Sequence, residues 1–310
     1  MRIAVLVGGP SPERDGSYLS GEAAQKALIV LGHTADLIDM SDDGFWKTLN
    51  EYDAAFIAGH GWFAEDGKLQ GLLELQGVPY TGPGVLSSAI GMHKPTFKKL
   101  MKAEGIPTAP WAVLRSDASG HEINDVIERL GAALFGKPAS SGESLAAGIV
   151  RSADDLRALI QAEGEFTPDE YLVEPLLEGN TLTVGVLEVD GELQTLPVLE
   201  AIPHKEFYDS QAKSDPQMRT YRCPALLPQE VTSALHELAR RVFTACACRG
   251  VARVDFMMGF DGPVVLEINT VPGLTHQGNL AAMCEAHGLS YERMIEIILD
   301  SAAGRPAYCP

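Results

Sequence analysis

The sequence predicts an α/β protein in which a small doubly wound parallel sheet is followed by two α+β units. Apolar strand-like runs and helical periodicity alternate over residues 1–93. Antiparallel strands separated by turn signals dominate from Thr181 onward, and two apolar runs joined by Gly259-Phe-Asp-Gly262 indicate a pair of facing strands. A chain of 310 residues that is 45% hydrophobic can bury a sizeable core, and its length suggests two or three domains.

The first predicted domain, residues 1–93, alternates strands with helices. Its expected elements are the strand Ile3 to Val7, the helix Ser17 to Leu31, the strands His33 to Ile38 and Ala54 to Ile57, and the helix Leu69 to Gln76. Ligands gather beyond the carboxyl ends of the strands in such sheets. The loops from Gly8 to Glu13 and from Gly59 to Gly61 fall at these ends and are therefore candidate binding loops.

The second predicted domain, residues 94–180, mixes helices with short strands around a loop rich in Gly and Ser, Ala139 to Gly148. Gly105 and Pro107 close its first helix, since neither residue favours continuing a helix. The expected helices are Thr96 to Glu104, Ile123 to Leu130 and Ala153 to Ala162, and the expected strands are Ala112 to Leu114, Ala133 to Pro138, Ile149 to Val150 and Glu170 to Pro175.

The third predicted domain, residues 181–310, is dominated by antiparallel strands. Asp190-Gly191 is typical of a two-residue hairpin turn. A long amphipathic helix from Pro228 to Ala247 leads into the facing strands, and a final helix is expected from Ser290 to Ala302.

Composition narrows the classes of function. The net charge of −18, from 24 Lys+Arg against 42 Asp+Glu, disfavours nucleic acid and anionic membranes as partners. No apolar run approaches the roughly 20 residues of a membrane span, and Met1 to Val7 is too short for an export signal. The five cysteines are odd in number and lack a C-x-x-C pair, and Cys246-Ala-Cys248 is expected on a helix. This cysteine pattern indicates reduced thiols, which are typical of a protein in the cytoplasm.

The facing strands carry the most informative residues. Glu267 and Asn269 are two apart on one strand and point the same way, and Asp255 on the other strand can meet them. Three oxygen ligands beside the cation Arg253 suit magnesium ions that hold a polyphosphate. The alternative is a surface hairpin with ordinary charges.

Further motifs follow one another along nearly the whole chain. They are Gly8-Gly9-Pro-Ser-Pro-Glu13, His60-Gly61, Glu65-Asp66-Gly67-Lys-Leu-Gln70-Gly71, Val78-Pro79-Tyr80-Thr81-Gly82, Lys137-Pro138, Glu174-Pro-Leu-Leu-Glu-Gly179, Phe207-Tyr208-Asp209 with Lys213, and Pro272-Gly273-Leu274-Thr275. Each motif is weak alone, but in this order the chain resembles the D-alanine–D-alanine ligase family of the ATP-grasp superfamily. The resemblance implies an ATP-grasp fold and a ligase that activates one amino acid's carboxylate as an acylphosphate, which a second amino acid's amine then attacks.

The resemblance also implies roles for single residues. Asp255, Glu267 and Asn269 would hold two Mg²⁺ ions, with Mn²⁺ as a substitute, and Lys213 would reach the transferring phosphoryl group. Arg253 and the N–H of Gly273 would stabilise the oxyanion of the tetrahedral intermediate. The nucleotide would be bound by Lys94, Lys137, Ser144, Glu174, Pro175 and Leu177. The alternatives are a solvated lysine for Lys94 and the polar end of a buried strand for Glu174.

Substrate contacts are expected from Glu13, which would bind the first amino acid's ammonium, and from His60, for which an ordinary loop histidine is the alternative. The chain departs from the family where substrates bind. Glu143 and Ser214 replace a serine and a tyrosine, and the loop before Asn279 and Leu280 is one residue longer than usual. Glu143 would repel Glu13 as an anion, or would bind a cationic substrate group.

Three functions therefore remain open. The leading hypothesis is an ATP- and Mg²⁺-dependent ligase of two small amino acids. The second is a related ligase of a specialised pathway with another acceptor or a cationic substrate, and the third is an ATP-binding protein without turnover. Lids would be formed by the loops 140–148 and 208–222, and the resemblance implies a homodimer formed through the first domain.

Overall fold

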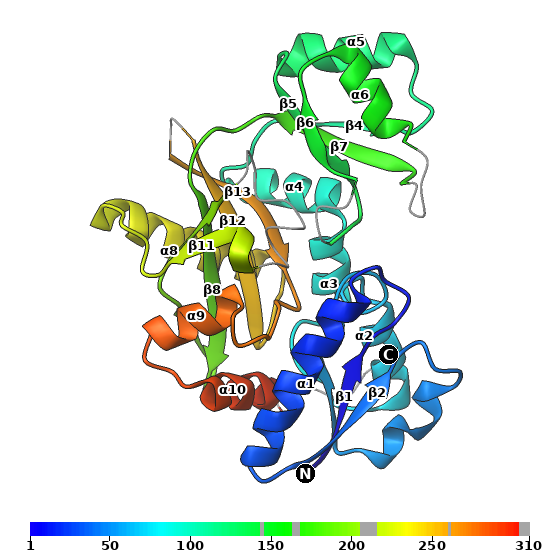
Figure 1. Ribbon diagram of the computed structural model, residues 1–310, viewed down its shortest axis with the longest axis vertical. Helices are drawn as coiled ribbons and strands as arrows, with labels where there is room; N and C mark the ends of the chain where they lie inside the picture. Colours follow the sequence, from blue (N-terminus) through cyan, green and yellow to red (C-terminus); the bar gives the residue numbers. More distant parts are fainter. Residues whose placement is uncertain (143–145, 163–167, 205–215, 260–261, 304–310) are drawn as a thin grey trace.

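The computed structural model describes residues 1–142, 146–162, 168–204, 216–259 and 262–303. Three sheets follow one another along the long axis of the molecule (Figure 1), each built from one stretch of the chain. The sheet of residues 2–57 lies at one end, the small sheet of residues 112–175 lies at the other, and the sheet of residues 181–269 lies between these ends, displaced to one side.

The N-terminal sheet is parallel, with the order β2-β1-β3, as predicted for a doubly wound unit. Its strands are β1 (Arg2–Val7), β2 (Thr34–Asp39) and β3 (Ala54–Ile57). Residues Ile3 to Val7 are fully buried because α1 (Arg14–Val30) covers one face of the sheet, and η1 (Phe45–Glu51) and α2 (Lys68–Gln76) cover the other. Gly8 and Gly9 both have positive φ, which glycine adopts at no steric cost, and they turn the chain out of β1.

The central sheet is antiparallel, with the order β4-β7-β5-β6. Its strands are β4 (Ala112–Arg115), β5 (Leu134–Pro138), β6 (Gly148–Val150) and β7 (Glu170–Pro175), and α5 (Gly120–Leu130) and α6 (Ala153–Ile160) pack on it. Ser119 begins α5 with a capping box, in which its side chain accepts from the backbone of Glu122 while the Glu122 carboxylate accepts from the backbone of Ser119.

The C-terminal sheet is antiparallel, with β9 paired to β8 beside the path β11-β10-β8-β12-β13. The turn between β8 and β9 is the predicted hairpin, since Asp190 and Gly191 have φ of 52° and 81°, as a two-residue I′ turn requires. Its elements are β8 (Thr181–Val189), β9 (Glu192–Thr195), β10 (Leu199–Pro203), η2 (Pro216–Met218), β11 (Arg219–Arg222), α8 (Gln229–Ala245), β12 (Val251–Gly259) and β13 (Gly262–Asn269).

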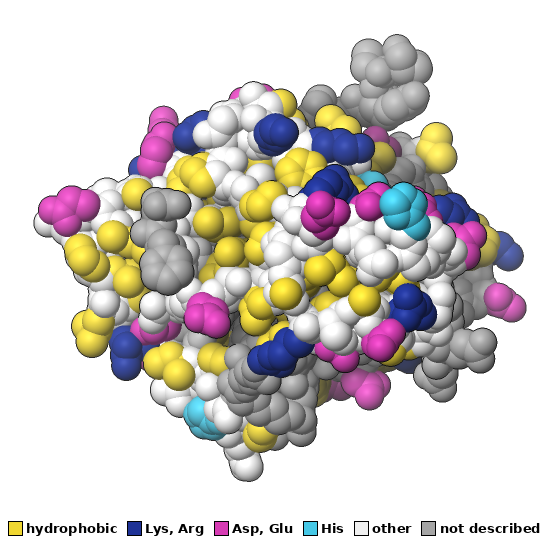
Figure 2. All heavy atoms as spheres, turned by 90° about the horizontal axis from the view of Figure 1, so that it is seen from above, with side chains coloured by type: hydrophobic (Ala, Val, Ile, Leu, Met, Phe, Trp, Pro, Cys, Tyr) yellow, Lys and Arg dark blue, Asp and Glu magenta, His cyan; other side chains and the backbone are white. Residues whose placement is uncertain are grey.

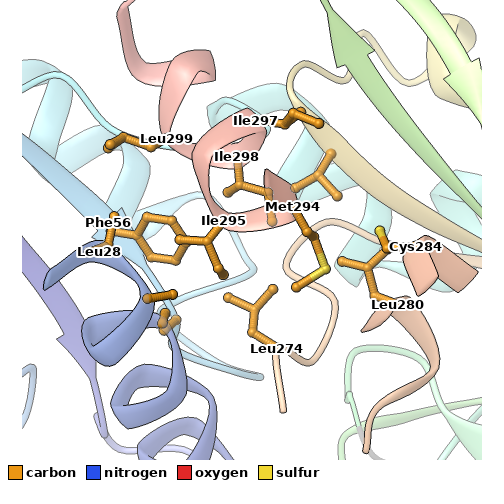
Figure 3. Close-up of a cluster of buried hydrophobic side chains, with 14 of the residues drawn as sticks. Leu28, Phe56, Leu274, Leu280, Cys284, Met294, Ile295, Ile297, Ile298 and Leu299 are labelled. Carbon is orange, nitrogen blue, oxygen red and sulfur yellow. The ribbon is translucent and has the colours of Figure 1, made fainter. Parts of the chain in front are cut away.

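Several elements cross the predicted domain boundaries. The helix α4 (Lys94–Ala103), in the predicted second domain, buries Phe97 and Met101 in the core of the C-terminal sheet. The C-terminal helix α10 (Tyr291–Ala303) places Ile295 beside Leu28 of α1 and Phe56 of β3, and Met294 on the side of α9 (Asn279–Ala286) (Figure 3). The N-terminal and C-terminal sheets therefore share one hydrophobic core.

Two details differ from the sequence analysis. Cys246 ends α8 and Ala247 has a φ of 53°, so Cys246 and Cys248 do not lie on a helix together, although both are buried as free thiols. The helices α3 (Val85–Met92), η1, η2 and α9 were not predicted. No described helix combines the length and the apolar character needed to span a membrane. Figure 2 looks down on the end of the molecule that carries α5 and α6, and positively and negatively charged side chains are interspersed on this surface.

Candidate active site

The β12–β13 hairpin places the predicted metal ligands together. Its register pairs Asp255 with Glu267 and Arg253 with Asn269, so all four side chains lie on one face of the sheet. A β-bulge follows directly after Asp255. The period-two reasoning from the sequence is therefore confirmed in the geometry of these strands.

Asp255 is the centre of a hydrogen-bond network on this face. Arg253 donates through Nε to Oδ1 and through Nη2 to Oδ2, each over 2.9 Å. Asn269 Nδ2 donates to Oδ2 over 3.0 Å, and Thr183 Oγ1 of β8 donates to Oδ1 over 2.6 Å. This two-pronged ion pair holds the guanidinium plane in one orientation. Thr183 escaped the sequence analysis because nothing in the β8 sequence shows that it faces Asp255.

A cavity of about 500 Å³ lies between the central and C-terminal sheets. Four of the predicted nucleotide-binding residues line it, namely Lys137, Glu174, Pro175 and Leu177. Asp255 and Glu267 of the hairpin line it as well. A concave site with apolar walls and a few converging charges suits a nucleotide.

Glu174 is the anion between two buried lysines. Lys137 Nζ lies 3.0 Å from its Oε2, and Lys98 Nζ contacts its Oε1. Burial opposes ionisation of Glu174, but the charges of Lys137 and Lys98 outweigh it and lower the pKa of the carboxyl group. Burial likewise opposes the charge of Lys137, and Glu174 and Glu267 raise its pKa nevertheless. The sequence analysis missed Lys98, which looks like the neighbouring solvent-facing lysines of the same helix.

Lys94 is buried, so the solvated alternative is wrong. It begins α4, where its Nζ donates to the carbonyl of Ser141 and lies 3.8 Å from Glu267 Oε2. The ammonium group therefore links the Gly/Ser loop to the hairpin. Lys94 and Lys137 approach Glu267 from two different elements.

A second cavity of about 680 Å³ lies farther along the same face of the hairpin, where Arg253 and Asn269 line it. Its walls come from α1, from the loops after β3 and β13, and from β11. Glu13 lies here, packed so closely that a Cβ added to Gly61 or Gly142 would come within 2.6 Å or 2.0 Å of its Oε1. The two glycines therefore make room for this carboxylate. The predicted substrate residues that line the cavity are Glu13, His60 and Asn279, and the predicted oxyanion donors Arg253 and Gly273 line it as well.

His60 and Glu65 hold the loop that carries Gly273. Ser20 Oγ bonds His60 Nε2 over 2.9 Å and accepts from the N–H of Leu274 over 3.2 Å. Glu65 accepts from Val271 N over 3.2 Å and from Gly61 N over 2.6 Å. Burial lowers the pKa of His60 to about 4 and raises the pKa of Glu65 to about 7. Glu65 was read only as part of a motif, because its donor Val271 is 206 positions away in the sequence.

One predicted substrate residue is misplaced. Leu280 is fully buried in the core shared by α9 and α10, and it does not line the cavity. It follows Asn279 on the first turn of α9, where its side chain turns inward as Asn279 turns toward Arg253. The predictions for Glu143, Ser144, Lys213 and Ser214 lie outside the described residues.

Comparisons with known proteins agree with this geometry. Residues 100–300 match the family model described as D-ala D-ala ligase C-terminus. A D-alanine–D-alanine ligase of Syntrophotalea carbinolica is 40% identical, over 98% of this chain and 97% of that protein. One of Geobacter sulfurreducens is 36% identical, over 97% and 94%. The structure of a D-alanine–D-alanine ligase from Bacillus anthracis complexed with ATP has a TM-score of 0.84 at 28% identity, covering 98% of this chain and 97% of that one.

This chain belongs to the D-alanine–D-alanine ligase family.

Membership confirms the predicted ATP-grasp fold and the predicted class of an ATP-using ligase that forms C–N bonds. A D-alanyl-alanine synthetase A from Vibrio cholerae, at 23% identity and a TM-score of 0.86, supports the fold. As a D-alanine–D-alanine ligase family member, the chain acts on small amino acids. The roles of single residues remain predictions, and the structure adds Lys98, Thr183 and Glu65 to the residues that hold the site together.

Proposed function

We propose that this protein activates the carboxylate of D-alanine, or of a similar small amino acid, with ATP and joins it to the amine of a second amino acid. One observation carries the proposal: the β12–β13 hairpin lines both cavities. Asp255 and Glu267 face the cavity suited to a nucleotide, while Arg253 and Asn269 face the cavity that holds Glu13. A phosphoryl donor and its acceptor would therefore meet on one rigid strand pair.

The chemistry needs two steps. A carboxylate oxygen of the first amino acid attacks the γ-phosphorus of ATP, and ADP leaves with the electrons of the broken P–O bond. The amine of the second amino acid, which has lost a proton, then attacks the acyl carbon and displaces phosphate. The lysines Lys94 and Lys137 supply positive charge for the first step. Arg253 and the N–H of Gly273 would stabilise the oxyanion of the second, where one donor is worth roughly 3–4 kcal/mol.

The hairpin also fits the predicted Mg²⁺ ions in its donor chemistry. Two carboxylates and one amide on one face supply the hard oxygen ligands that Mg²⁺ prefers. Asn269 now donates Nδ2 to Asp255, so only the oxygen of the same amide can bind a cation. When bound, Mg²⁺ would neutralise charge on the phosphates. We propose further that the enzyme works in the cytoplasm as a homodimer formed through the N-terminal domain, as the family resemblance implies.

Glu13 is the proposed anchor of the first amino acid's ammonium group. It begins α1 in the wall of the second cavity, where Gly61 and Gly142 pack against its carboxylate. An ammonium group bound there leaves the substrate carboxylate free to reach toward the hairpin. Ser20 and Glu65 support this arrangement by fixing the backbone on both sides of Gly273.

A phosphate-release assay over D- and L-amino acids tests the proposal. We expect ATP- and Mg²⁺-dependent phosphate release that requires amino acids and yields a dipeptide detectable by mass spectrometry. Glu267→Gln should lower kcat at least about 100-fold, since it removes one charge from the site of phosphoryl transfer. Glu128→Gln, the same change on an exposed face of α5, should leave kcat unchanged.

Two outcomes would contradict the proposal. Phosphate release that does not depend on any amino acid would indicate a different reaction. A rise in melting temperature with ATP and Mg²⁺, but no dipeptide from any amino acid, would favour the ATP-binding protein without turnover.

A further inference from the structure

Arg219 is a charged residue of the second cavity to which no role has been assigned so far. It begins β11 and is only 9% exposed, although its side chain lines the cavity. Its guanidinium lies over the ring of Tyr221, 4.7 Å from the centroid, and Nη2 lies 3.5 Å from the carbonyl of Gln277. Arg219 and Tyr221 are two apart on the strand and therefore face the cavity together.

The charges of the cavity wall are divided between the two domains. The N-terminal wall, where α1 begins, carries Glu13 and Asp15. The C-terminal wall carries both arginines found among the described lining residues, Arg219 and Arg253. An amino acid bound between these walls would direct its ammonium group to the first wall and a carboxylate to the second.

Arg253 is held in place by side chains of the hairpin and of α9. Two of its nitrogens bond Asp255, and Nη1 donates to Asn279 Oδ1 over 3.3 Å. Because arginine only donates, this contact turns the oxygen of Asn279 toward Arg253 and leaves Nδ2 as the donor that Asn279 presents to the cavity. The amide and Arg219 thus supply donors to the same wall.

Arg219 is too remote from the hairpin to hold the reacting carboxylate. The strand order places β11 three steps from β12, which corresponds to roughly 14 Å at about 4.8 Å per step. A long arginine side chain reaches about half of that distance into the cavity. Its guanidinium is therefore suited to a group at the far end of a bound substrate.

We propose that Arg219 determines acceptor specificity by binding a carboxylate of the second amino acid, with Asn279 Nδ2 as an additional donor. Guanidinium matches a carboxylate with two parallel hydrogen bonds and keeps its charge at every relevant pH. Stacking on Tyr221 holds the guanidinium plane, so little freedom is lost when the substrate binds. The inference rests on the proposed function. The bound group is either the α-carboxylate or a side-chain carboxylate of the acceptor.

Steady-state kinetics of Arg219→Gln with different acceptors distinguish the α-carboxylate from a side-chain carboxylate as the bound group. With the first amino acid saturating, KM is measured for alanine, aspartate and alaninamide as acceptors, in the configuration that the phosphate-release assay selects. We expect the substitution to raise KM about 10- to 100-fold for carboxylate acceptors, as for a lost charged hydrogen bond, with kcat within about twofold.

The two possible bound groups predict different changes of KM across the three acceptors. If Arg219 binds the α-carboxylate, KM rises for alanine and aspartate, while alaninamide is used equally by both proteins. If it binds a side-chain carboxylate, KM rises for aspartate alone. Arg219→Lys, which keeps the charge but loses the two-pronged geometry, should recover part of the loss.

Controls separate this inference from folding and from the proposed function. Arg129→Gln makes the same change on an exposed face of α5 and should leave every KM unchanged, and the melting temperature of Arg219→Gln with ADP should match that of the unaltered protein. Equal KM values in Arg219→Gln and the unaltered protein for all three acceptors would overturn the role of Arg219 alone. Failure of the unaltered protein to ligate any acceptor would instead overturn the proposed function and this inference with it.

Discussion

His60 and Glu65 lie on one wall of the second cavity, and burial shifts their pKa values in opposite directions. His60 is held neutral, since burial lowers its pKa from 6.5 to about 4. Glu65 is held neutral at acidic pH, since burial raises its pKa from 4.5 to about 7. Both side chains position the loop of Gly273 through Ser20 and Val271. The wall therefore contains two groups that favour their uncharged forms.

Their contributions to stability should have opposite dependence on pH. As pH falls from 6.5 to 4, the unfolded chain binds a proton at His60 before the folded protein does, so His60 lowers the free energy of unfolding. As pH falls from about 7 to 4.5, Glu65 binds a proton in the folded protein before it does in the unfolded chain, so Glu65 raises the free energy of unfolding. In the unaltered protein the two effects partly cancel.

Single substitutions should separate the two effects. Relative to the unaltered protein, His60→Asn should become more stable as pH falls from 6.5 to 4, and Glu65→Gln less stable as pH falls from 7 to 4.5. Each slope should approach about 1.4 kcal/mol per pH unit, for a total of the order of 2–3 kcal/mol. Urea unfolding at a series of pH values measures these differences. Slopes of the same sign in both variants would contradict the assignment.

At the scale of residues, the sequence predicted the positions of the site residues best where these residues lie on one pair of strands. Asp255 and Glu267 could be placed opposite each other because side chains alternate along strands. Lys98 could not be found, since its partner Glu174 is 76 positions away and only the fold brings them together. Leu280 was placed in the pocket by analogy with the family, whereas the turn of α9 directs it into the core.

At the scale of elements, most helices were predicted from their apolar periodicity, including α1, α2 and α8, which begin without a side-chain cap. Ser119 and Glu122 mark the start of α5, and the predicted helix ends at Leu130 as observed. The helix α3 has the sequence Val-Leu-Ser-Ser-Ala-Ile-Gly-Met, in which serines and glycine weaken helical propensity, and its packing stabilises it instead. The short helices η1 and α9 lack side-chain caps too.

The capping box of α5 should stabilise the central sheet measurably. Ser119→Ala removes the side chain that accepts from the N–H of Glu122, and we expect a loss of about 1 kcal/mol. Hydrogen exchange should show the loss in α5 and in the strands it covers. Ser233→Ala, an exposed change within α8, has no capping bond to lose and serves as the control. Unchanged exchange rates in α5 would show that the cap contributes nothing to the stability of this domain.

At the scale of the whole molecule, the cores do not follow the order of the sequence. The predicted boundary at residue 94 assigns α4 to the central domain, yet its Phe97 and Met101 pack with the C-terminal sheet. The C-terminal helix α10 completes the core of the N-terminal sheet. Such long-range packing leaves no local signal in the sequence. The central sheet, in contrast, has a hydrophobic cluster of its own.

This arrangement predicts which parts of the protein unfold together. Ile295 of α10 is fully buried between Leu28, Phe56 and Met294 in the core shared by the N-terminal and C-terminal sheets (Figure 3). Ile295→Ala should lower the free energy of unfolding by about 2–5 kcal/mol, because it leaves a cavity in a packed core. Hydrogen exchange should then speed up in β1 and in β8 to a similar extent, since both strands depend on that core.

A matched substitution in the central sheet gives the contrast. Ile123 of α5 is equally buried, but its neighbours all belong to the separate cluster of the central sheet. Ile123→Ala should therefore speed exchange in β4 and β7 while β1 and β8 keep their protection. Faster exchange in β8 alone after Ile295→Ala would show that the N-terminal sheet is stable without α10. Separate cores allow separate unfolding transitions. Equal effects of both substitutions on exchange in all four strands would instead show that the three sheets unfold as one unit.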